Sequence, residues 1–224
     1  ADGIAAAMDE FFDSLNALSA QPADTGLRRV ALQMGQAVAS AWSDAAQSLS
    51  SVREDAVAAA GLAADKVGGL LSDLRRLNEQ MVGLSATAGA VNPLHDQRDA
   101  LLTELARTVE VNVDLDAIGR ANIRLGPGPG GTSLLEGLSA AAMQVSSSRP
   151  LSVTVTREDS RIETVVLTGG VLGGQAGAIA SLDAAIGDLD ALALRFSNDL
   201  NAAHRAGLDL NAQPGGDLFR LTGV

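Results

Sequence analysis

The feature that most constrains this chain is one apolar stripe that continues from Leu27 to Leu84. Apolar residues recur along it in steps of three and four, the 3.5-residue period of a coiled-coil seam. The stripe consists of Leu27, Ala31, Met34, Val38, Ala41, Ala45, Leu49, Val52, Ala56, Ala59, Ala63, Val67, Leu70, Leu74, Leu77, Met81 and Leu84. Two consecutive steps of four, Ala59 to Ala63 to Val67, predict a local unwinding. We expect one helix over 27–87, with an irregularity expected first at Gly68–Gly69, and such a helix would be about 90 Å long.

Shorter helical patterns lie on both sides of this stripe. Met8, Phe11, Phe12, Leu15 and Leu18 share one helix face, and Asp24 or Thr25 provides the cap of the following helix. Asn92-Pro93 has the composition of a helix start, with Leu101, Leu102, Leu105 and Val109 on the buried side. The helical period returns from Leu182 to Ala203, with His204 and Arg205 in the last turn and Gly207 as a left-handed terminator.

Between these helices, the sequence pattern over residues 108–168 predicts strands. Val109, Val111, Val113 and Leu115 alternate with polar residues, which predicts a half-buried strand over 108–115. Further strands are expected over 122–125, 132–136, 151–156 and 162–167, with a poorly ordered or loosely helical connection over 137–149. The predicted fold class is therefore α+β: an elongated bundle of long antiparallel helices with an inserted small antiparallel β domain.

We expect three parts in the chain: a discontinuous helical rod (1–107 and 169–207), a β domain (108–168) and a Gly/Asp-rich tail (208–224). The rod is expected to pack through two sets of apolar residues, one from each long helix, and the β domain to be dispensable for it. These helix-packing residues are Leu70, Leu74 and Leu77 against Leu189, Ala193 and Phe196.

Composition excludes several classes of function. The 16 basic and 27 acidic residues give a net charge of −11, which argues against nucleic acid as a partner. Aromatic residues make up only 2%, too few for base-stacking surfaces or an aromatic-lined pocket. No apolar run approaches the roughly 18 residues of a membrane span, and no start resembles a signal peptide. Cysteine is absent, so thiolate chemistry and disulfides are excluded.

The sequence contains only incomplete motifs for a catalytic or ligand-binding site. His95-Asp96 could act as a base and its orienting group, and His204 could bind a metal, but each has a simpler place at a helix end. The loop 126–131 is glycine-rich yet lacks the Lys-Ser/Thr of a phosphate loop. Asp209, Asn211, Gln213 and Asp217 form a degenerate calcium-loop pattern without its closing Glu. We therefore expect no catalytic site, cofactor or metal.

Three stretches carry a specific resemblance. They are Phe11 to Leu18, the run from Asn92 to Leu105 (NPLHDQRDALLTEL, following Leu77-Asn78-Glu79-Gln80), and the run from Leu172 to Phe219 that contains Asn201, His204 and Gly207. Together and in this order, the chain resembles the family of hook-associated protein 1 of the bacterial flagellum, the hook–filament junction proteins. The match covers nearly the whole chain but not the family's terminal segments, which implies an internal core fragment.

The resemblance implies a structural axial protein rather than an enzyme. Its partners would be copies of itself in a ring, the hook protein and the filament-side junction protein, with neither membrane nor nucleic acid. It would lie outside the cell after export without a cleaved signal peptide, and the fragment alone would be monomeric. The family-motif residues would then be architectural: Asp96, Arg98, Asp99, Asn201, His204 and Gly207. The alternative is a secreted adhesin or secretion-apparatus tip protein whose β domain binds a surface ligand.

Overall fold

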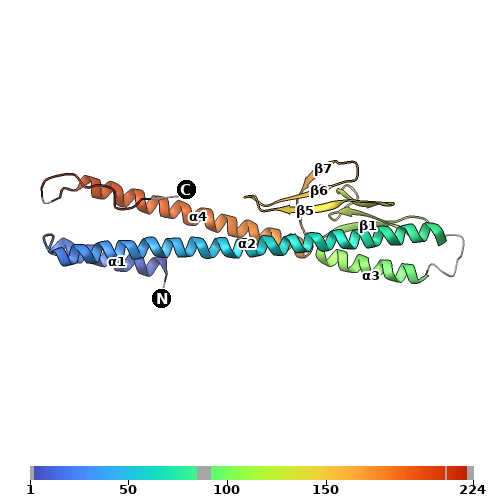
Figure 1. Ribbon diagram of the computed structural model, residues 1–224, viewed down its shortest axis with the longest axis horizontal. Helices are drawn as coiled ribbons and strands as arrows, with labels where there is room; N and C mark the ends of the chain where they lie inside the picture. The colour runs from blue at the N-terminus through green and yellow to red at the C-terminus, as the bar shows by residue number, and fades with distance from the viewer. Residues whose placement is uncertain (1–2, 85–91, 210, 221–224) are drawn as a thin grey trace. The chain divides into compact units, whose positions relative to one another are not determined.

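The computed structural model describes residues 3–84, 92–209 and 211–220. Within these residues the chain forms four helices and seven strands (Figure 1). The helices are α1 (Ile4–Ala20), α2 (Thr25–Leu84), α3 (Asn92–Thr108) and α4 (Gly170–Ala206). The strands are β1 (Val111–Leu115), β2 (Ala121–Leu125), β3 (Ser133–Glu136), β4 (Ser139–Ala140), β5 (Ala142–Ser146), β6 (Ser152–Thr156) and β7 (Ile162–Val165). The predicted α+β class is confirmed.

The chain folds into two compact units. One consists of Ala1–Val52 with Ala184–Val224, and the other is Arg53–Asp183. Helices α2 and α4 therefore each contribute one part to each unit. These boundaries do not coincide with the expected ones at 107/108 and 168/169, because a large part of the expected rod shares a unit with the strands.

The long helix predicted from the apolar stripe is confirmed as α2, which begins after a side-chain cap. Asp24 Oδ1 accepts hydrogen bonds from the backbone N–H groups of Gly26 (2.7 Å) and Leu27 (3.0 Å). The irregularity expected at Gly68–Gly69 is wrong, since α2 continues through both glycines. A helical glycine costs about 1 kcal/mol relative to alanine. Burial of Val67 and Leu71 on either side offsets this cost. The predicted helix end near residue 87 lies outside the described residues.

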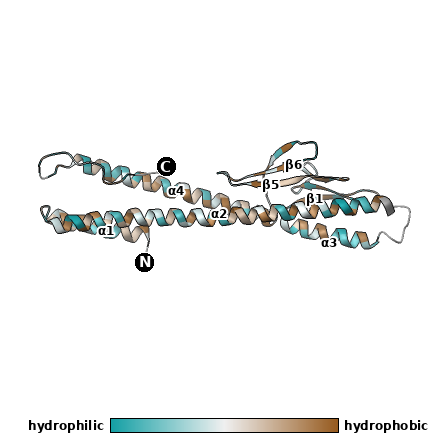
Figure 2. Cartoon of the chain, in the orientation of Figure 1, coloured by the Kyte–Doolittle hydropathy of each residue, from teal (hydrophilic) through white to brown (hydrophobic). Residues whose placement is uncertain are grey.

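Apolar residues are interspersed with polar ones along α1, α2 and α4 (Figure 2). Among the described residues, no helix is both long enough and apolar enough to cross a membrane.

The first unit is built around aromatic side chains. Phe11 of α1 packs with Val38 and Trp42 of α2, and these three are almost fully buried. Leu189, Ala193 and Phe196 of α4 join the same cluster. Phe12 was expected on the buried face but is 42% exposed. Neighbouring residues on a helix point about 100° apart, so Phe12 lies at the rim of the cluster, where its ring contacts Phe196 while Phe11 is buried.

The second unit contains two antiparallel sheets, with strand orders β1-β2-β3-β4 and β5-β6-β7. In the first sheet, Val113 pairs with Ile123, and the register shifts between Ile123 and Arg124 at a bulge. In the second sheet, Gln144, Thr154 and Thr164 form one row across all three strands.

Both sheets share a single core with α2, α3 and α4. Its buried members are Ala60, Ala64, Val67, Leu71, Leu74, Leu105, Val109, Ala121, Ile123, Leu125, Leu134, Leu135, Ala141, Met143, Val153, Val155, Leu172 and Ile179. Because helices and strands bury the same apolar surface, the β region is not an appendage that the helices could lose without consequence. The shared core argues against the expectation that the β region is dispensable, and removal of residues 108–168 would test it.

The expected packing of Leu70, Leu74 and Leu77 against Leu189, Ala193 and Phe196 is also wrong. Leu74 belongs to the core of the second unit, with Leu70 packed against it, whereas Leu189, Ala193 and Phe196 belong to the aromatic cluster of the first. A heptad pattern tells which positions need covering but not which element covers them. Leu71, off the predicted seam, is fully buried, since α2 is covered over a wider face than a seam.

Three local predictions also need correction. The strand expected from 108 begins at Val111, because α3 continues to Thr108; Val113 and Leu115, expected on its buried face, are 36% and 46% exposed. The connection over 137–149 contains β4 and β5, in which small residues make the apolar–polar alternation weak.

The start of the last helix was also predicted wrongly. The helix begins at Gly170, twelve residues before Leu182, and its first turns are glycine-rich, with poor helix propensity. Tertiary packing of Leu172 and Ile179 outweighs this propensity.

The entry and exit of the β region lie side by side. The Thr168 hydroxyl donates to Glu110 Oε2 at 2.7 Å. A Cβ on Gly170, whose φ is +71°, would lie 2.7 Å from the carbonyl carbon and oxygen of Thr108 and from the nitrogen of Val109. Only glycine allows this approach of one backbone to another.

Candidate functional site

The end of α4 is held to the chain that follows it by two of the motif residues. Asn201, 7% exposed, donates from Nδ2 to the carbonyl of Phe219 (2.7 Å). Its Oδ1 accepts from the N–H groups of Leu218 (2.8 Å) and Phe219 (2.9 Å). His204 Nδ1 is 2.6 Å from the carbonyl oxygen of Gly216. The tail therefore folds back along α4 rather than leading away from it.

This returning segment completes the aromatic cluster. The Phe219 ring lies 6.0 Å from Phe11 and 5.6 Å from Phe196, both in edge-to-face geometry. Trp42 lies 6.3 Å from Phe196. Edge-to-face pairs of this kind contribute about 0.5–1.5 kcal/mol beyond the burial of their area. The Asn201 hydrogen bonds therefore position an aromatic side chain of the core.

The turn between α4 and the returning segment is closed by Asp209. Its Oδ1 accepts from the N–H groups of Asn211 and Gln213, both at 2.8 Å. These bonds, Gln213 first, hold the pKa of Asp209 below its usual range. Asp217, another residue of the calcium-like pattern, pairs instead with Arg205. Among the described residues, no group of His, Cys, Asp or Glu could hold a metal ion.

Gly207 does not have the expected left-handed conformation, since its φ is not among the positive values of the described residues. Its N–H donates to the carbonyl of His204 (3.2 Å), and its carbonyl accepts from Gly215 (3.1 Å). α4 therefore ends in a tight turn that the returning chain stabilises.

The second motif, at the start of α3, fixes the turn between β1 and β2. Arg98, 7% exposed, donates from Nη1 to the carbonyl of Gly119 (2.6 Å) and from Nη2 to Asp99 (2.7 Å). His95 Nε2 is buried without a hydrogen-bond partner, and Gly119 packs directly against it. Asp96 is exposed. The structure thus brings Arg98 and Asp99 together but does not pair His95 with Asp96 as base and orienting group.

The turn itself is organised by Asp116. Burial raises the pKa of Asp116, but donation from the Arg120 side chain and from the N–H groups of Arg120 and Ile118 outweighs it. The net result is a pKa below the usual range. The carboxylate is 2.6 Å from Arg120 Nε and accepts from the two N–H groups at 2.9 and 3.1 Å.

Sequence reasoning missed a third polar anchor, Asn78 of α2. It is fully buried, donates to the carbonyls of Ala121 (2.9 Å) and Gly137 (2.7 Å), and accepts from the N–H of Ala121 (2.9 Å). It therefore joins the long helix to two points of the first sheet. The one sequence signal for its burial is that Asn78 directly follows Leu77, a residue of the apolar stripe.

Sequence reasoning also missed Arg53, a charged residue that directly follows Val52 of the apolar stripe. It is 4% exposed and makes a two-pronged ion pair with Asp183 (2.5 and 3.3 Å). Its guanidinium also donates to the carbonyls of Ser147 (3.3 Å) and Ser148 (2.7 Å). Removing one partner of such a buried pair costs about 3–5 kcal/mol. Arg53 thus fixes the β5–β6 loop against α2 and α4.

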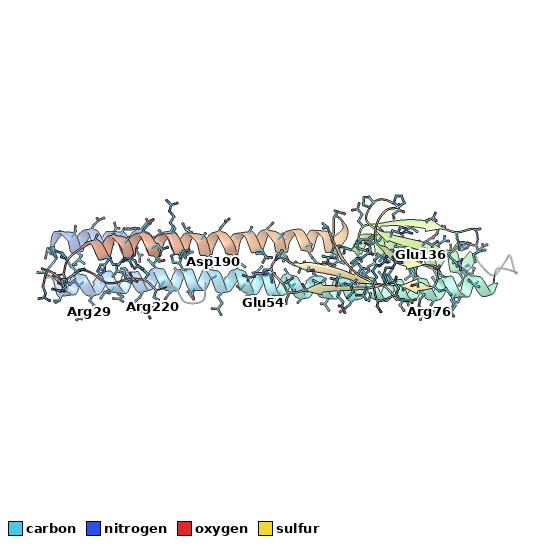
Figure 3. All side chains as sticks on the ribbon, turned by 90° about the horizontal axis from the view of Figure 1, so that it is seen from above. Arg29, Glu54, Arg76, Glu136, Asp190 and Arg220 are labelled. Carbon is cyan, nitrogen blue, oxygen red and sulfur yellow. The ribbon has the colours of Figure 1, made fainter. Side chains whose placement is uncertain are left out.

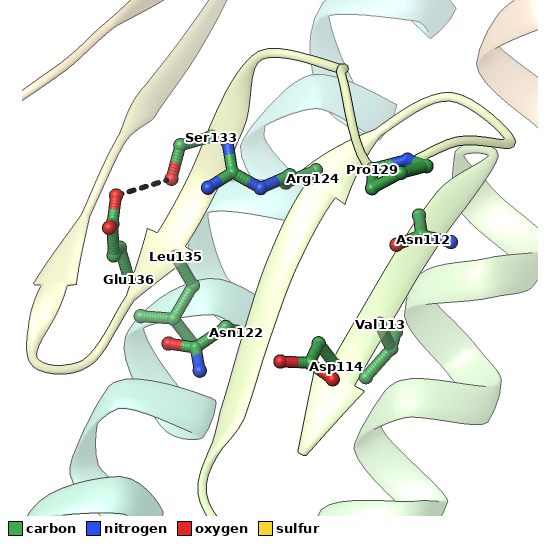
Figure 4. Close-up of a pocket in the computed structure, with 9 residues that line it drawn as sticks. All are labelled: Asn112, Val113, Asp114, Asn122, Arg124, Pro129, Ser133, Leu135 and Glu136. Carbon is green, nitrogen blue, oxygen red and sulfur yellow. Dashed lines mark hydrogen bonds between the residues drawn. The ribbon is translucent and has the colours of Figure 1, made fainter. Parts of the chain in front are cut away.

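A hollow of about 590 Å³ lies on the face of the first sheet (Figure 4). It is lined by Asn112, Val113, Asp114, Asn122, Arg124, Pro129, Ser133, Leu135 and Glu136. The Ser133 hydroxyl donates to Glu136 Oε2 at 3.5 Å. Neither histidine nor cysteine is among these residues, and the only side-chain partner given for the Ser133 hydroxyl in the described part of the chain is the Glu136 carboxylate, at the limit of hydrogen-bond distance. Elsewhere, charged side chains such as Glu54, Arg76 and Asp190 are exposed on α2 and α4 (Figure 3).

Comparison with known proteins gives a consistent result. A family model described as the helical domain of flagellar hook-associated protein FlgK matches residues 1–219. The flagellar hook-associated protein 1 of Escherichia coli (strain K12) is 28% identical over 228 residues, and that of Bacillus subtilis (strain 168) is 26% identical over 247. These matches cover 97% and 99% of this chain but 41% and 49% of the two relatives. The chain therefore spans less than half the length of these curated relatives.

A solved structure described as the flagellar hook junction protein FlgK from Burkholderia pseudomallei superposes with a TM-score of 0.83 at 29% identity. The match covers 96% of this chain and 40% of that one. The family model takes in both motif regions and the strands between them, so the resemblance read from the sequence is confirmed. The chain belongs to the family of flagellar hook-associated protein FlgK, whose helical domain it matches from residue 1 to residue 219.

Proposed function

We propose that this chain is the helical-domain part of a structural axial protein, an adaptor that joins hook and filament at the hook–filament junction of the bacterial flagellum. The observation that carries the proposal is the family match over residues 1–219, together with a solved relative described as a hook junction protein. The comparisons give no support to the alternative of an adhesin or a secretion tip.

The chemistry of the buried polar groups supports a structural role. Asn78, Arg98 and Asn201 each bind backbone groups of a segment distant in sequence. A catalytic group needs its donor or acceptor free for a substrate, whereas these groups are committed to the fold. We infer that the motif residues Asp96, Arg98, Asp99, Asn201, His204 and Gly207 serve the architecture of the domain rather than binding a ligand.

The proposal extends to location and partners. The family is one of flagellar components, so we place the protein outside the cell at the junction, after export without a cleaved signal peptide. Its partners would be further copies in a ring, the hook protein and the filament-side junction protein. The net charge of −11 agrees with the absence of nucleic acid from this set.

A genetic experiment tests the proposal. In the bacterium that encodes the chain, the gene segment for residues 1–224 is deleted in frame, and an intact copy is supplied on a plasmid. We expect cells with the deletion to make hooks but to release filament protein into the medium and not to swim, and the plasmid to restore both. Attached filaments and normal swimming in cells with the deletion would contradict the proposal.

A further inference from the structure

The chain passes between the two units at only two points. The second unit begins at Arg53 and ends at Asp183, and the residues up to Val52 and from Ala184 belong to the first. Both points lie inside continuous helices, α2 and α4. A change in one unit can therefore travel along the chain to the other only through these two helices.

Neither core covers these two points. On α2, the aromatic cluster has its last member at Trp42, and the core of the second unit begins at Ala56. On α4, that core ends at Ile179, and the aromatic cluster begins at Leu189. Of the apolar side chains between these limits, only Ile186 is buried, and it belongs to neither core. The apolar packing of both cores therefore stops short of the points where the helices pass from one unit to the other.

A buried polar cluster occupies these positions instead. The ion pair of Arg53 with Asp183 joins the first residue of the second unit to its last. The β5–β6 loop completes the cluster, because Arg53 also donates to the carbonyls of Ser147 and Ser148, and Arg149 Nε lies 3.6 Å from Asp183 Oδ1. We call these five residues the Arg53–Asp183 clamp.

The clamp differs from the other ion pairs of the two long helices. The side chains of Arg53 and Asp183 are 5% and 16% exposed. Elsewhere in the described part of α2 and α4, both side chains of each ion pair are at least 37% exposed. Exposed pairs contribute little to stability, whereas a two-pronged pair between nearly buried groups fixes distance and orientation together.

We infer that the Arg53–Asp183 clamp insulates the second unit, so that the first unit can open without unfolding the strands. Helices α2 and α4 both contribute to the core of the second unit, which therefore requires a fixed spacing where the two helices leave it. With the clamp in place, this spacing is set inside the second unit. Without the clamp, the spacing depends on how the first unit packs.

The position of the clamp suits this role. Proteins open locally in contiguous cooperative units, and the ends of such units are where fraying begins. Arg53 and Asp183 are the two ends of the second unit, so fraying that enters from the first unit meets the clamp before it reaches the core. The inference is independent of the proposed function, because it concerns how stability is shared within the chain.

The test combines a change in the first unit with a change in the clamp. Phe11→Ala removes a buried ring from the aromatic cluster and so weakens the first unit. It is introduced into the parent chain and into Asp183→Asn, which removes the negative charge of the clamp. Asp73→Asn is the matched control, because it removes the same kind of charge from the exposed pair with Arg76 on α2.

Two measurements follow the two units separately. The single tryptophan, Trp42, belongs to the first unit, so its fluorescence in urea verifies that Phe11→Ala weakens that unit. Hydrogen exchange of the backbone amides of β2 and β6 reports opening of the second unit. In the parent chain and in Asp73→Asn, we expect Phe11→Ala to speed this exchange by less than about twofold; in Asp183→Asn, by about tenfold or more.

Three outcomes overturn the inference. One is an equal effect of Phe11→Ala on the strands in the parent chain and in Asp183→Asn. Another is an effect of about tenfold already in the parent chain, which would mean that the clamp does not insulate. The third is an effect in Asp73→Asn as large as in Asp183→Asn. If Asp183→Asn does not fold, Arg53→Met combined with Asp183→Leu replaces it, since this pair leaves no unpaired buried charge, and the same comparison decides.

Discussion

At the scale of single residues, Leu74 and Leu62 carry the same side chain on the same helix, but Leu74 is fully buried and Leu62 is 72% exposed. Leu74→Asp would place an unpaired carboxylate in the core that helices and sheets share. We expect it to lower the free energy of unfolding by about 3 kcal/mol or more. Leu62→Asp is the matched control and should change it by less than about 0.5 kcal/mol. Urea unfolding measures both, and equal stability of the two variants would contradict the assigned core.

Asp116 makes stability depend on pH. Its pKa is lower in the folded chain than in the unfolded one, so its contribution is present above the unfolded pKa and is lost as the pH falls through the folded pKa. Asp116→Asn removes the ion pair with Arg120. The variant should therefore melt at a lower temperature than the parent near about pH 6, and the difference should shrink below about pH 4. A difference that stays constant or grows in acid would show that Asp116 is not a stabilising carboxylate.

At the scale of elements, the start of α4 depends on a glycine where two backbones meet. Gly170 has a φ of +71°, and a Cβ there would contact Thr108 and Val109 at 2.7 Å. We expect Gly170→Ala to destabilise the protein by about 1–3 kcal/mol. Gly174→Ala, four residues further along the same helix with nothing within 4 Å of its Cβ, should stabilise it by about 0.5–1 kcal/mol. Denaturant unfolding of the two variants should therefore give changes of opposite sign, and two changes of the same sign would disprove the close approach.

Three helices are joined to other segments by buried polar side chains as well as by apolar packing. Asn78 joins α2 to β2 and to the β3–β4 turn, and Arg98 joins α3 to the β1–β2 turn. Asn201 joins α4 to the returning segment. In each case, the helix side chain donates a hydrogen bond to a backbone carbonyl of the segment that it joins. An amide or guanidinium that binds those carbonyls removes the cost of burying them unpaired.

At the scale of the whole molecule, we expect the chain to be monomeric in dilute solution. Its net charge of −11 makes copies repel at low salt, where the screening length exceeds about 10 Å. Light scattering coupled to size exclusion at about 10 μM measures the mass. A stable dimer or ring under these conditions would contradict this expectation.

The sequence by itself determined the elements whose signal is local. The repeat in α2, the Asp24 cap, the Asn92-Pro93 start of α3 and the pairing of 151–156 with 162–167 depend on neighbours in the chain, so they could be predicted. The motifs around Arg98 and Asn201 likewise indicated the family. The tertiary structure decided what covers each stripe: Leu74 packs under α3 and the sheets rather than under Phe196. It also decided where α4 begins and which polar residues, Asn78 and Arg53, are buried. These outcomes depend on surfaces that come together only on folding, because a periodic pattern records that a face is covered but carries no information on which apolar surface covers it.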